Sequence, residues 1–513
     1  MPAANKRTAV DAPTKIKTLL VPRVPKLRCV IGRPVGSMQD CDDQCSGIVA
    51  SACVLRYGIL TFALIVLLIP EIARMLLRRA LPLFLMILGF LAIPASCPAA
   101  TTAAEAKADR FAAHDSTAYR LPPEKMRKAV GLTRIRDVYY PANAIWLPVQ
   151  IILILCLGWA ARMRDLAVGL SKNRWLQGYA FVFLFLLTTT LLTLPLDLYR
   201  HHVSLAYGFS VQGWVSWFGD QAKSFGLTWL IGGLLTMILF WVIRKSPTRW
   251  WLWFWMVAVG FTIAGVFITP YVIDPLFNKF EPLSKSDPAL VERLEQVAAR
   301  GGIAIPPERM FLMKASAKVT TLNAYVTGFG ASKRVVVWDT TIAKATPDEI
   351  TFIFAHESGH YALNHVVIGV AVTCVALLPF FWLGYHAVRL LLGRYGGVWR
   401  ITSQQDWGAL AVLVLVLTVL STISEPMVNG FSRMIEHNAD VYGQEAVHGI
   451  VANPQAVGRQ SFQVLGEDSL DDPTPHPLFE WWFDTHPPNR FRAAFAEAYD
   501  PWAAGEFPKY FPK

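Results

Sequence analysis

Long apolar runs separated by short polar loops dominate the sequence from about residue 80 onward. A helix needs about 20 mostly apolar residues to cross the hydrocarbon core of a bilayer. Runs of that length, or nearly so, lie at about 80–96, 144–161, 176–196, 226–243, 250–270, 366–391 and 407–424. Tryptophans such as Trp146 and Trp175 stand at the ends of runs, where their rings favour the headgroup region. The pattern predicts a mainly α-helical, polytopic membrane protein of about seven transmembrane helices.

Two longer polar regions, residues 271–365 and 425–513, flank the last two apolar runs. Within the first, Pro288–Arg300 has the period of an amphipathic helix, and Lys333–Trp338 has the composition of a buried strand. Both regions therefore resemble soluble protein, and we expect them to form one α+β domain between them. Residues 101–270 would form an N-terminal membrane domain, and 366–424 would supply two further spans.

The first hundred residues permit several interpretations. Residues 1–75 are rich in Lys, Arg, Pro and Cys without a periodic pattern, which indicates either a disordered extension or a mis-assigned start at Met1 in place of Met75. Residues 76–100 have the shape of a signal peptide or signal anchor, with basic residues before an apolar run and small residues after it. The apolar run Tyr57–Pro70 is short for a span. Cys97 raises a lipoprotein site, which Pro94 disfavours.

Composition excludes an ordinary soluble protein, because 54% of the residues are hydrophobic and only 17% are charged. The formal net charge of +11 comes from basic residues in short loops between apolar runs. That arrangement favours contact with anionic lipid at the bilayer surface, and we expect no nucleic-acid partner. The seven cysteines have neither the spacing of a disulfide framework nor that of a cysteine zinc site.

The chemistry of the chain centres on the segment His356-Glu357-Ser358-Gly359-His360. Thr346 and Glu349 upstream can form a capping box that opens a helix through this segment. Two histidines four residues apart on a helix share one face, so both imidazoles can bind one Zn²⁺. Glu357 then projects beside the metal and can accept the proton of the attacking water. The alternative is a pair of helix histidines held by core hydrogen bonds.

A catalytic zinc needs a third protein ligand, and Glu436 is the candidate. Asp440, one turn later on the same helix face, can accept the ring N–H of a ligand histidine and fix its tautomer. His437 is a rival ligand, although it points about 100° away from Glu436 on a helix. The acidic pair could also be a solvated helix face.

Two further segments carry candidate substrate contacts. His486, held by the Pro487-Pro488 turn, can donate a hydrogen bond to the oxyanion of a tetrahedral intermediate, or it can be a surface histidine. An edge strand starting near Asn323 could bind an extended peptide by strand addition, or it could be an interior hairpin strand. The substrate-binding candidates are Asn323, Ala324, Tyr325 and Arg490.

These motifs, taken together, resemble the integral-membrane CAAX prenyl protease family, type 1. The resemblance runs from about Leu121 to Arg492. It rests on Pro195–Phe209, Pro275–Leu283, Asn323–Tyr325, Asp339–Thr341, the zinc helix, Glu436–Asp440 and His486-Pro487, in the family's order. It implies spans around a chamber and a zincin-like α+β catalytic domain formed by the two polar regions. It also implies one Zn²⁺ per chain on His356, His360 and Glu436, Glu357 as the base, and His486 near the substrate carbonyl.

The leading functional hypothesis is a membrane metalloendopeptidase that hydrolyses peptides or membrane-protein segments. A quality-control protease of broad specificity has the same chemistry, and a multi-pass transport or binding protein with a structural zinc is the alternative from another class. The basic loops around Arg164, Arg244 and Arg400 should be cytoplasmic. This predicts an integral protein of a bacterial inner membrane with its catalytic domain on the periplasmic side.

Overall fold

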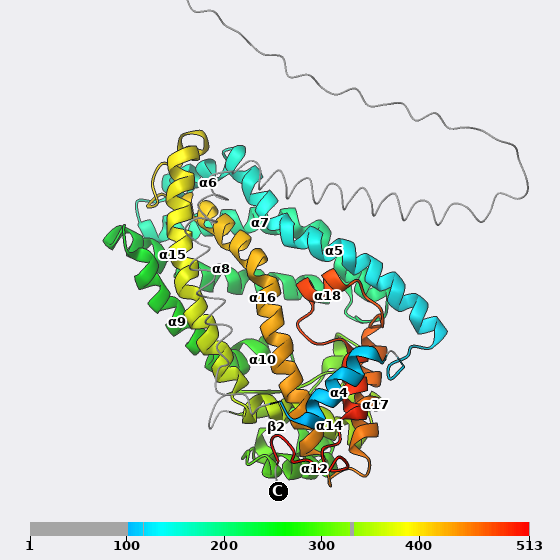
Figure 1. Cartoon of the computed structure of the whole chain (residues 1–513). Helices are drawn as coiled ribbons and strands as arrows, with labels where there is room; N and C mark the ends of the chain where they lie inside the picture. The colour runs from blue at the N-terminus through cyan, green and yellow to red at the C-terminus, as the bar shows by residue number, and fades with distance from the viewer. Residues whose placement is uncertain (1–100, 116, 329–332, 512–513) are drawn as a thin grey trace, which may run out of the picture. The chain divides into compact units, whose positions relative to one another are not determined.

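The computed structural model of the chain describes residues 101–115, 117–328 and 333–511. The interpretations of residues 1–75 and 76–100, including the first apolar run and Cys97, lie outside the described residues. Figure 1 shows the described part as long helices that extend from a compact group of short helices and a small sheet.

Six helices in the described ranges are long and apolar enough to cross a membrane. They are α5 (Pro123–Cys156), α7 (Arg174–Ala206), α8 (Trp214–Lys245), α9 (Trp250–Ile268), α15 (His365–Trp399) and α16 (Ala409–Ala446). Each corresponds to one of the six apolar runs predicted after residue 100, so the mainly helical, polytopic class is confirmed. The first of these runs continues beyond the end of α5. The helix ends earlier because Gly158 adopts a left-handed φ of 69° and separates α5 from α6 (Trp159–Leu170).

The short basic loops lie together at one end of the long helices, away from the sheet (Figure 1). Arg164 of α6 forms an ion pair with Asp406 and donates to the carbonyl of Arg400 at 3.0 Å. The indole of Trp250 donates to the side chain of Gln404 at 2.9 Å. The three loops that positive-inside reasoning assigns to one side of the membrane are therefore joined by side-chain contacts.

A four-stranded sheet lies at the opposite end of the long helices. Its strands are β1 (Phe280–Pro282), β2 (Met310–Met313), β3 (Ala324–Thr327) and β4 (Arg334–Trp338), in the order β1-β2-β4-β3. The β2–β4 pair is parallel and the other two pairs are antiparallel. The segment predicted as a buried strand is β4, whose three valines are buried. Among the described strands β3 lies at the edge of the sheet, so the Asn323 segment leads into an edge strand and not an interior one.

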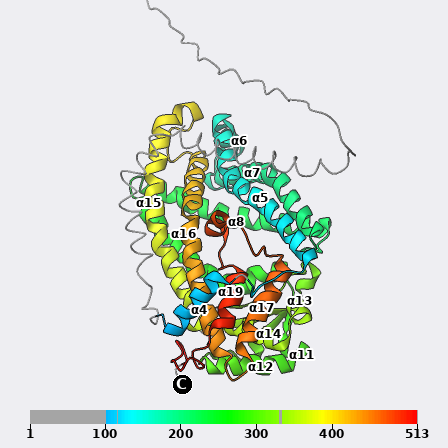
Figure 2. The same cartoon turned by 45° about the vertical axis from the view of Figure 1, so that its right-hand side comes forward.

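Short helices surround this sheet and form one hydrophobic core with it (Figure 2). The remaining α-helices are α4 (Ala103–His114), α10 (Asp274–Phe277), α11 (Leu283–Ser286), α12 (Pro288–Arg300), α13 (Asp339–Lys344), α14 (Pro347–Ala362), α17 (Pro454–Ser469), α18 (Pro477–Phe483) and α19 (Asn489–Ala498). Single turns of π-helix and 3₁₀-helix occupy Thr269–Ile273, Pro307–Arg309 and Ala315–Ala317. The predicted amphipathic helix Pro288–Arg300 is α12, with Leu294 and Val297 fully buried. The polar regions on both sides of α15 and α16 thus share one core, as the sequence pattern predicts.

Candidate active site

The helix α14 begins with the capping box that the sequence indicates. The Glu349 carboxylate accepts from the Thr346 N–H at 2.7 Å, and the Thr346 hydroxyl accepts from the Glu349 N–H at 3.3 Å. The helix then runs without a break through His356 and His360. Their Nε2 atoms lie 3.2 Å apart, so both rings converge on one point.

The membrane-length helix α16 brings Glu436 to the same point. Its Oε2 lies 3.3 Å from His356 Nε2, and its Oε1 lies 3.4 Å from His360 Nε2. The ligand atoms of the three residues all lie within 4.8 Å of one another. Among the described residues, the buried Glu436 Oε2 has no hydrogen-bond donor within bonding geometry. Two imidazoles and a carboxylate with an unsatisfied buried oxygen fit the ligand set of a catalytic Zn²⁺.

Two glycines allow α14 and α16 to approach closely enough for this convergence. A Cβ atom at Gly443 would lie 3.0 Å from the His356 backbone, and one at Gly359 would lie 3.0 Å from Tyr442 Cβ. Both contacts are tighter than most Cβ contacts in proteins, so a side chain at either position would push the two helices apart. The glycine in the histidine motif therefore has a packing function that a sequence motif alone does not state.

The far side of His356 is held by buried charges. His356 Nδ1 lies 2.9 Å from Asp440 Oδ1, and Arg492 of α19 contacts both Asp440 oxygens at 2.6 and 2.9 Å. Arg492 also lies 3.7 Å from Glu436 Oε2. Sequence reasoning proposed Asp440 but missed Arg492, which follows Arg490 by two residues and has no motif signal of its own.

Glu357 lines the cavity beside the two histidines. Burial raises the pKa of its carboxyl group to about 7, with the nearby Glu436 acting in the same direction and His356 opposing it. A backbone hydrogen bond from Val326 of β3 favours the ionised form. A carboxyl group with a pKa near neutrality is suited to accept a proton and then return it.

His486 lies in the loop between α18 and α19, with 56% of its side chain exposed. Its Nε2 is 3.5 Å from Glu436 Oε1, and its Nδ1 is 2.8 Å from the Thr485 hydroxyl. Partial burial lowers the pKa of His486, which favours the neutral ring. A neutral ring that accepts from Thr485 at Nδ1 carries its proton on Nε2, facing the histidine cluster.

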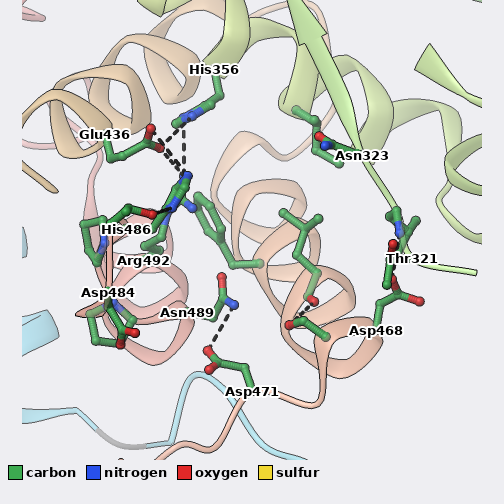
Figure 3. Close-up of a pocket in the computed structure, with 18 of the residues that line it drawn as sticks. Thr321, Asn323, His356, Glu436, Asp468, Asp471, Asp484, His486, Asn489 and Arg492 are labelled. Carbon is green, nitrogen blue, oxygen red and sulfur yellow. Dashed lines mark hydrogen bonds and ion pairs between the residues drawn. The ribbon is translucent and has the colours of Figure 1, made fainter. Parts of the chain in front are cut away.

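A cavity of about 700 Å³ opens beside these residues. Figure 3 shows His356, Glu436, His486 and Arg492 grouped at one end of it. Asn323 and Ala324 line the cavity, so this part of the edge strand can meet a bound molecule. Tyr325 packs on the opposite face of the sheet, against a small core around Val336.

Two other candidates lie apart from the cavity. Arg490 forms an ion pair with Glu480 at 3.1 Å and donates to the Pro473 carbonyl at 3.2 Å, so it braces the loop that carries His486. His437, the rival ligand, turns toward α4, where its Nε2 lies 3.2 Å from Asp109. Glu105 completes that cluster, and its carboxylate is already paired with the buried ammonium of Lys509 at 2.9 Å.

Family models match most of the chain. Residues 115–279 match the CAAX prenyl protease N-terminal model of five membrane helices, and residues 284–500 match the model of peptidase family M48. The two matches divide the chain close to the boundary between α10 and the sheet domain.

Individual proteins give the same result. The chain is 36% identical over 345 residues to "Uncharacterized metalloprotease YhfN" of Bacillus subtilis, which covers 67% of this chain and 79% of that protein. It is 37% identical over 194 residues to CAAX prenyl protease 1 of Saccharomyces cerevisiae, covering 37% of this chain and 42% of that one. The crystal structure of S. mikatae Ste24p superposes with a TM-score of 0.64 at 26% identity, covering 77% of this chain and 96% of that chain.

Proposed function

The chain belongs to the CAAX prenyl protease family within peptidase family M48 and is a zinc metalloprotease of the membrane, and we propose a role in peptide hydrolysis for each residue of its site. His356, His360 and Glu436 bind one Zn²⁺ per chain. The observation that carries the proposal is the convergence of their ligand atoms within 4.8 Å at one end of the cavity. When bound, the zinc lowers the pKa of water and polarises the peptide carbonyl.

Glu357 is the general base. It takes the proton from the attacking water and then delivers it to the amine that leaves when the peptide bond breaks. Its place in the cavity lining beside His356 and Glu436 supports both steps. The hydrogen bond from Val326 fixes the carboxylate beside β3.

His486 stabilises the charge that develops on the substrate carbonyl oxygen. Its Nε2–H faces the histidine cluster and can donate to that oxygen, while Thr485 holds the other side of the ring. Asp440 orients His356 by accepting its Nδ1–H, and Arg492 keeps Asp440 in place.

The substrate is an extended peptide segment of a membrane-associated protein. The position of β3 at the edge of the sheet supports this, because an edge strand has free backbone groups that can pair with a peptide. Asn323 and Ala324 contact the peptide, whereas the backbone of Tyr325 pairs with β4 and its side chain lies on the other face of the sheet. A broad quality-control specificity uses the same chemistry and differs only in which segments reach the cavity.

Metal analysis combined with a peptidase assay tests the proposal. Detergent-purified protein should contain about one zinc per chain, and chelation should abolish cleavage of a fluorogenic peptide library until Zn²⁺ is added back. Active protein without bound metal would overturn the assignment. Zinc-loaded protein that cleaves no peptide in the library and none in isolated membranes would overturn the peptidase proposal while leaving the metal site intact.

We also propose that the chain lies in a bacterial inner membrane with the catalytic region on the periplasmic side. The gathering of basic loops at the opposite end supports this orientation, since short basic loops stay in the cytoplasm. Single cysteines at the exposed positions Ser284 and Ser403, in a background without native cysteines, would be treated with an impermeant thiol reagent in spheroplasts. Labelling at Ser284 alone is expected, whereas labelling at Ser403 alone would reverse the orientation.

A further inference from the structure

The two histidines of the proposed zinc site have different supports. His356 is backed by the Asp440 carboxylate, which is itself paired with Arg492. The Nδ1 of His360 lies 3.1 Å from the Nδ1 of His365, a hydrogen-bonding distance between two rings. His365 is 9% exposed and lies outside the residues that line the cavity. No motif in the sequence pointed to it.

The positions of the protons in this contact follow from which ring nitrogen of His360 faces the other ligands. Its Nε2 lies 3.2 Å from His356 Nε2 and 3.4 Å from Glu436 Oε1, so Nε2 is the ligand atom. A neutral imidazole that binds metal through Nε2 keeps its proton on Nδ1. The His360 Nδ1–H must therefore donate to His365 Nδ1, and His365 carries its own proton on Nε2.

A tight connection between two helices places His365 in this position. α14 ends at Ala362, and α15 begins at His365. Between them Asn364 has a φ of 56°, in the left-handed region that asparagine tolerates better than most residues. The Asn364 N–H donates to the Tyr361 carbonyl at 3.1 Å, so the two helices are joined by a tight turn. The first residue of a membrane-length helix is thereby folded back onto a zinc ligand.

We propose that His365 is a positioning residue that fixes the tautomer and ring orientation of His360. It does for His360 what Asp440 does for His356, with a neutral acceptor in place of a carboxylate. Partners of this kind orient metal ligands, and their loss typically costs about 10–100-fold in metal affinity. The inference rests on the proposed zinc site, and it also makes the start of α15 part of the metal-binding unit.

Zinc affinity measured by competition with a chromophoric chelator tests the role without an activity assay. His365→Ala should bind zinc about 10–100-fold more weakly than the wild type. His365→Asn, whose side-chain oxygen can accept a hydrogen bond at nearly the position of Nδ1, should recover most of that loss. His448→Ala is the matched control, since it removes an imidazole that stacks on Trp502 and does not line the cavity.

Thermal melting of each variant with and without zinc separates positioning from a general packing role. The zinc-induced rise in Tm should shrink in His365→Ala and return in His365→Asn, because the rise depends on affinity within each variant whatever its metal-free Tm. Wild-type affinity in His365→Ala, or equal losses in the Ala and Asn variants, would overturn the inference. Wild-type protein that binds no zinc would instead overturn the proposed metal site.

Discussion

Threonine hydroxyls of the membrane helices and charged groups of the catalytic region find their hydrogen-bond partners in different places. In the long helices, threonine hydroxyls donate to carbonyls of their own helix, as Thr188 does to Leu184 at 2.8 Å and Thr418 to Val414 at 2.8 Å. In the catalytic region, polar groups from different helices depend on one another. His356 of α14, Asp440 of α16 and Arg492 of α19 form one buried chain of contacts.

The difference shows what each region must achieve. A helix in hydrocarbon has no water to satisfy its polar groups, so internal hydrogen bonds let it insert before its neighbours are in place. A metal site needs ligands held at fixed positions, which requires partners from several elements. Substitutions in the catalytic region should therefore affect distant residues, whereas those at helix-internal hydroxyls in the membrane region should stay local.

The largest effect is expected for Glu436→Ala. This change removes the one ligand that α16 supplies, leaving two histidines on one helix, which is too few for a stable zinc site. Purified protein should lose both zinc and peptide cleavage, as measured by metal analysis and a fluorogenic assay. Full zinc content in this variant would show that another residue is the third ligand.

Glu357→Gln should separate catalysis from metal binding. The amide can still accept the hydrogen bond from Val326 but cannot take a proton, so activity should fall by about 10²–10⁴-fold while zinc content is kept. The paired measurement is turnover against zinc per chain. Near wild-type turnover would contradict the assignment of Glu357 as the base.

Asp440→Asn tests the dependence between helices directly. It leaves the buried Arg492 without its carboxylate partner, which typically costs about 3–5 kcal/mol. A large fall in the metal-free Tm and a weaker affinity for zinc are expected. Asp348→Asn is the control, since it removes an ion pair with Arg293 in which both side chains are 44% exposed, and it should change the stability by less than about 1 kcal/mol. Equal effects of the two variants would show that the buried contact between helices matters no more than an exposed ion pair.

The smallest effect is expected for Thr418→Val in the membrane region. The Val414 carbonyl keeps its helix hydrogen bond after the hydroxyl is removed, and the two side chains have nearly the same shape. The Tm should change by only about a degree or two, and zinc content should stay the same. A loss as large as that of Asp440→Asn would show that a hydroxyl bonded within its own helix matters as much as the buried charges of the catalytic region.

The sequence by itself determined the features that depend on local periodicity. Apolar runs predicted the six described membrane-length helices, and the Thr346–Glu349 capping box predicted the start of α14. The spacing of His356 and His360 places them on one face because a helix has 3.6 residues per turn. Glu436 and Asp440 follow the same rule on α16, so these candidates could be named without a structure.

Only the tertiary structure decided which faces meet. Arg492 reaches Asp440 from 52 positions away and His356 from 136, and no local pattern identifies such partners. His365 is close to His360 in sequence, but their contact depends on the left-handed turn at Asn364. Periodicity shows the direction in which a side chain points along its own helix, whereas its partner is set by helix packing, which depends on the whole core and on the glycines that allow α14 and α16 to approach.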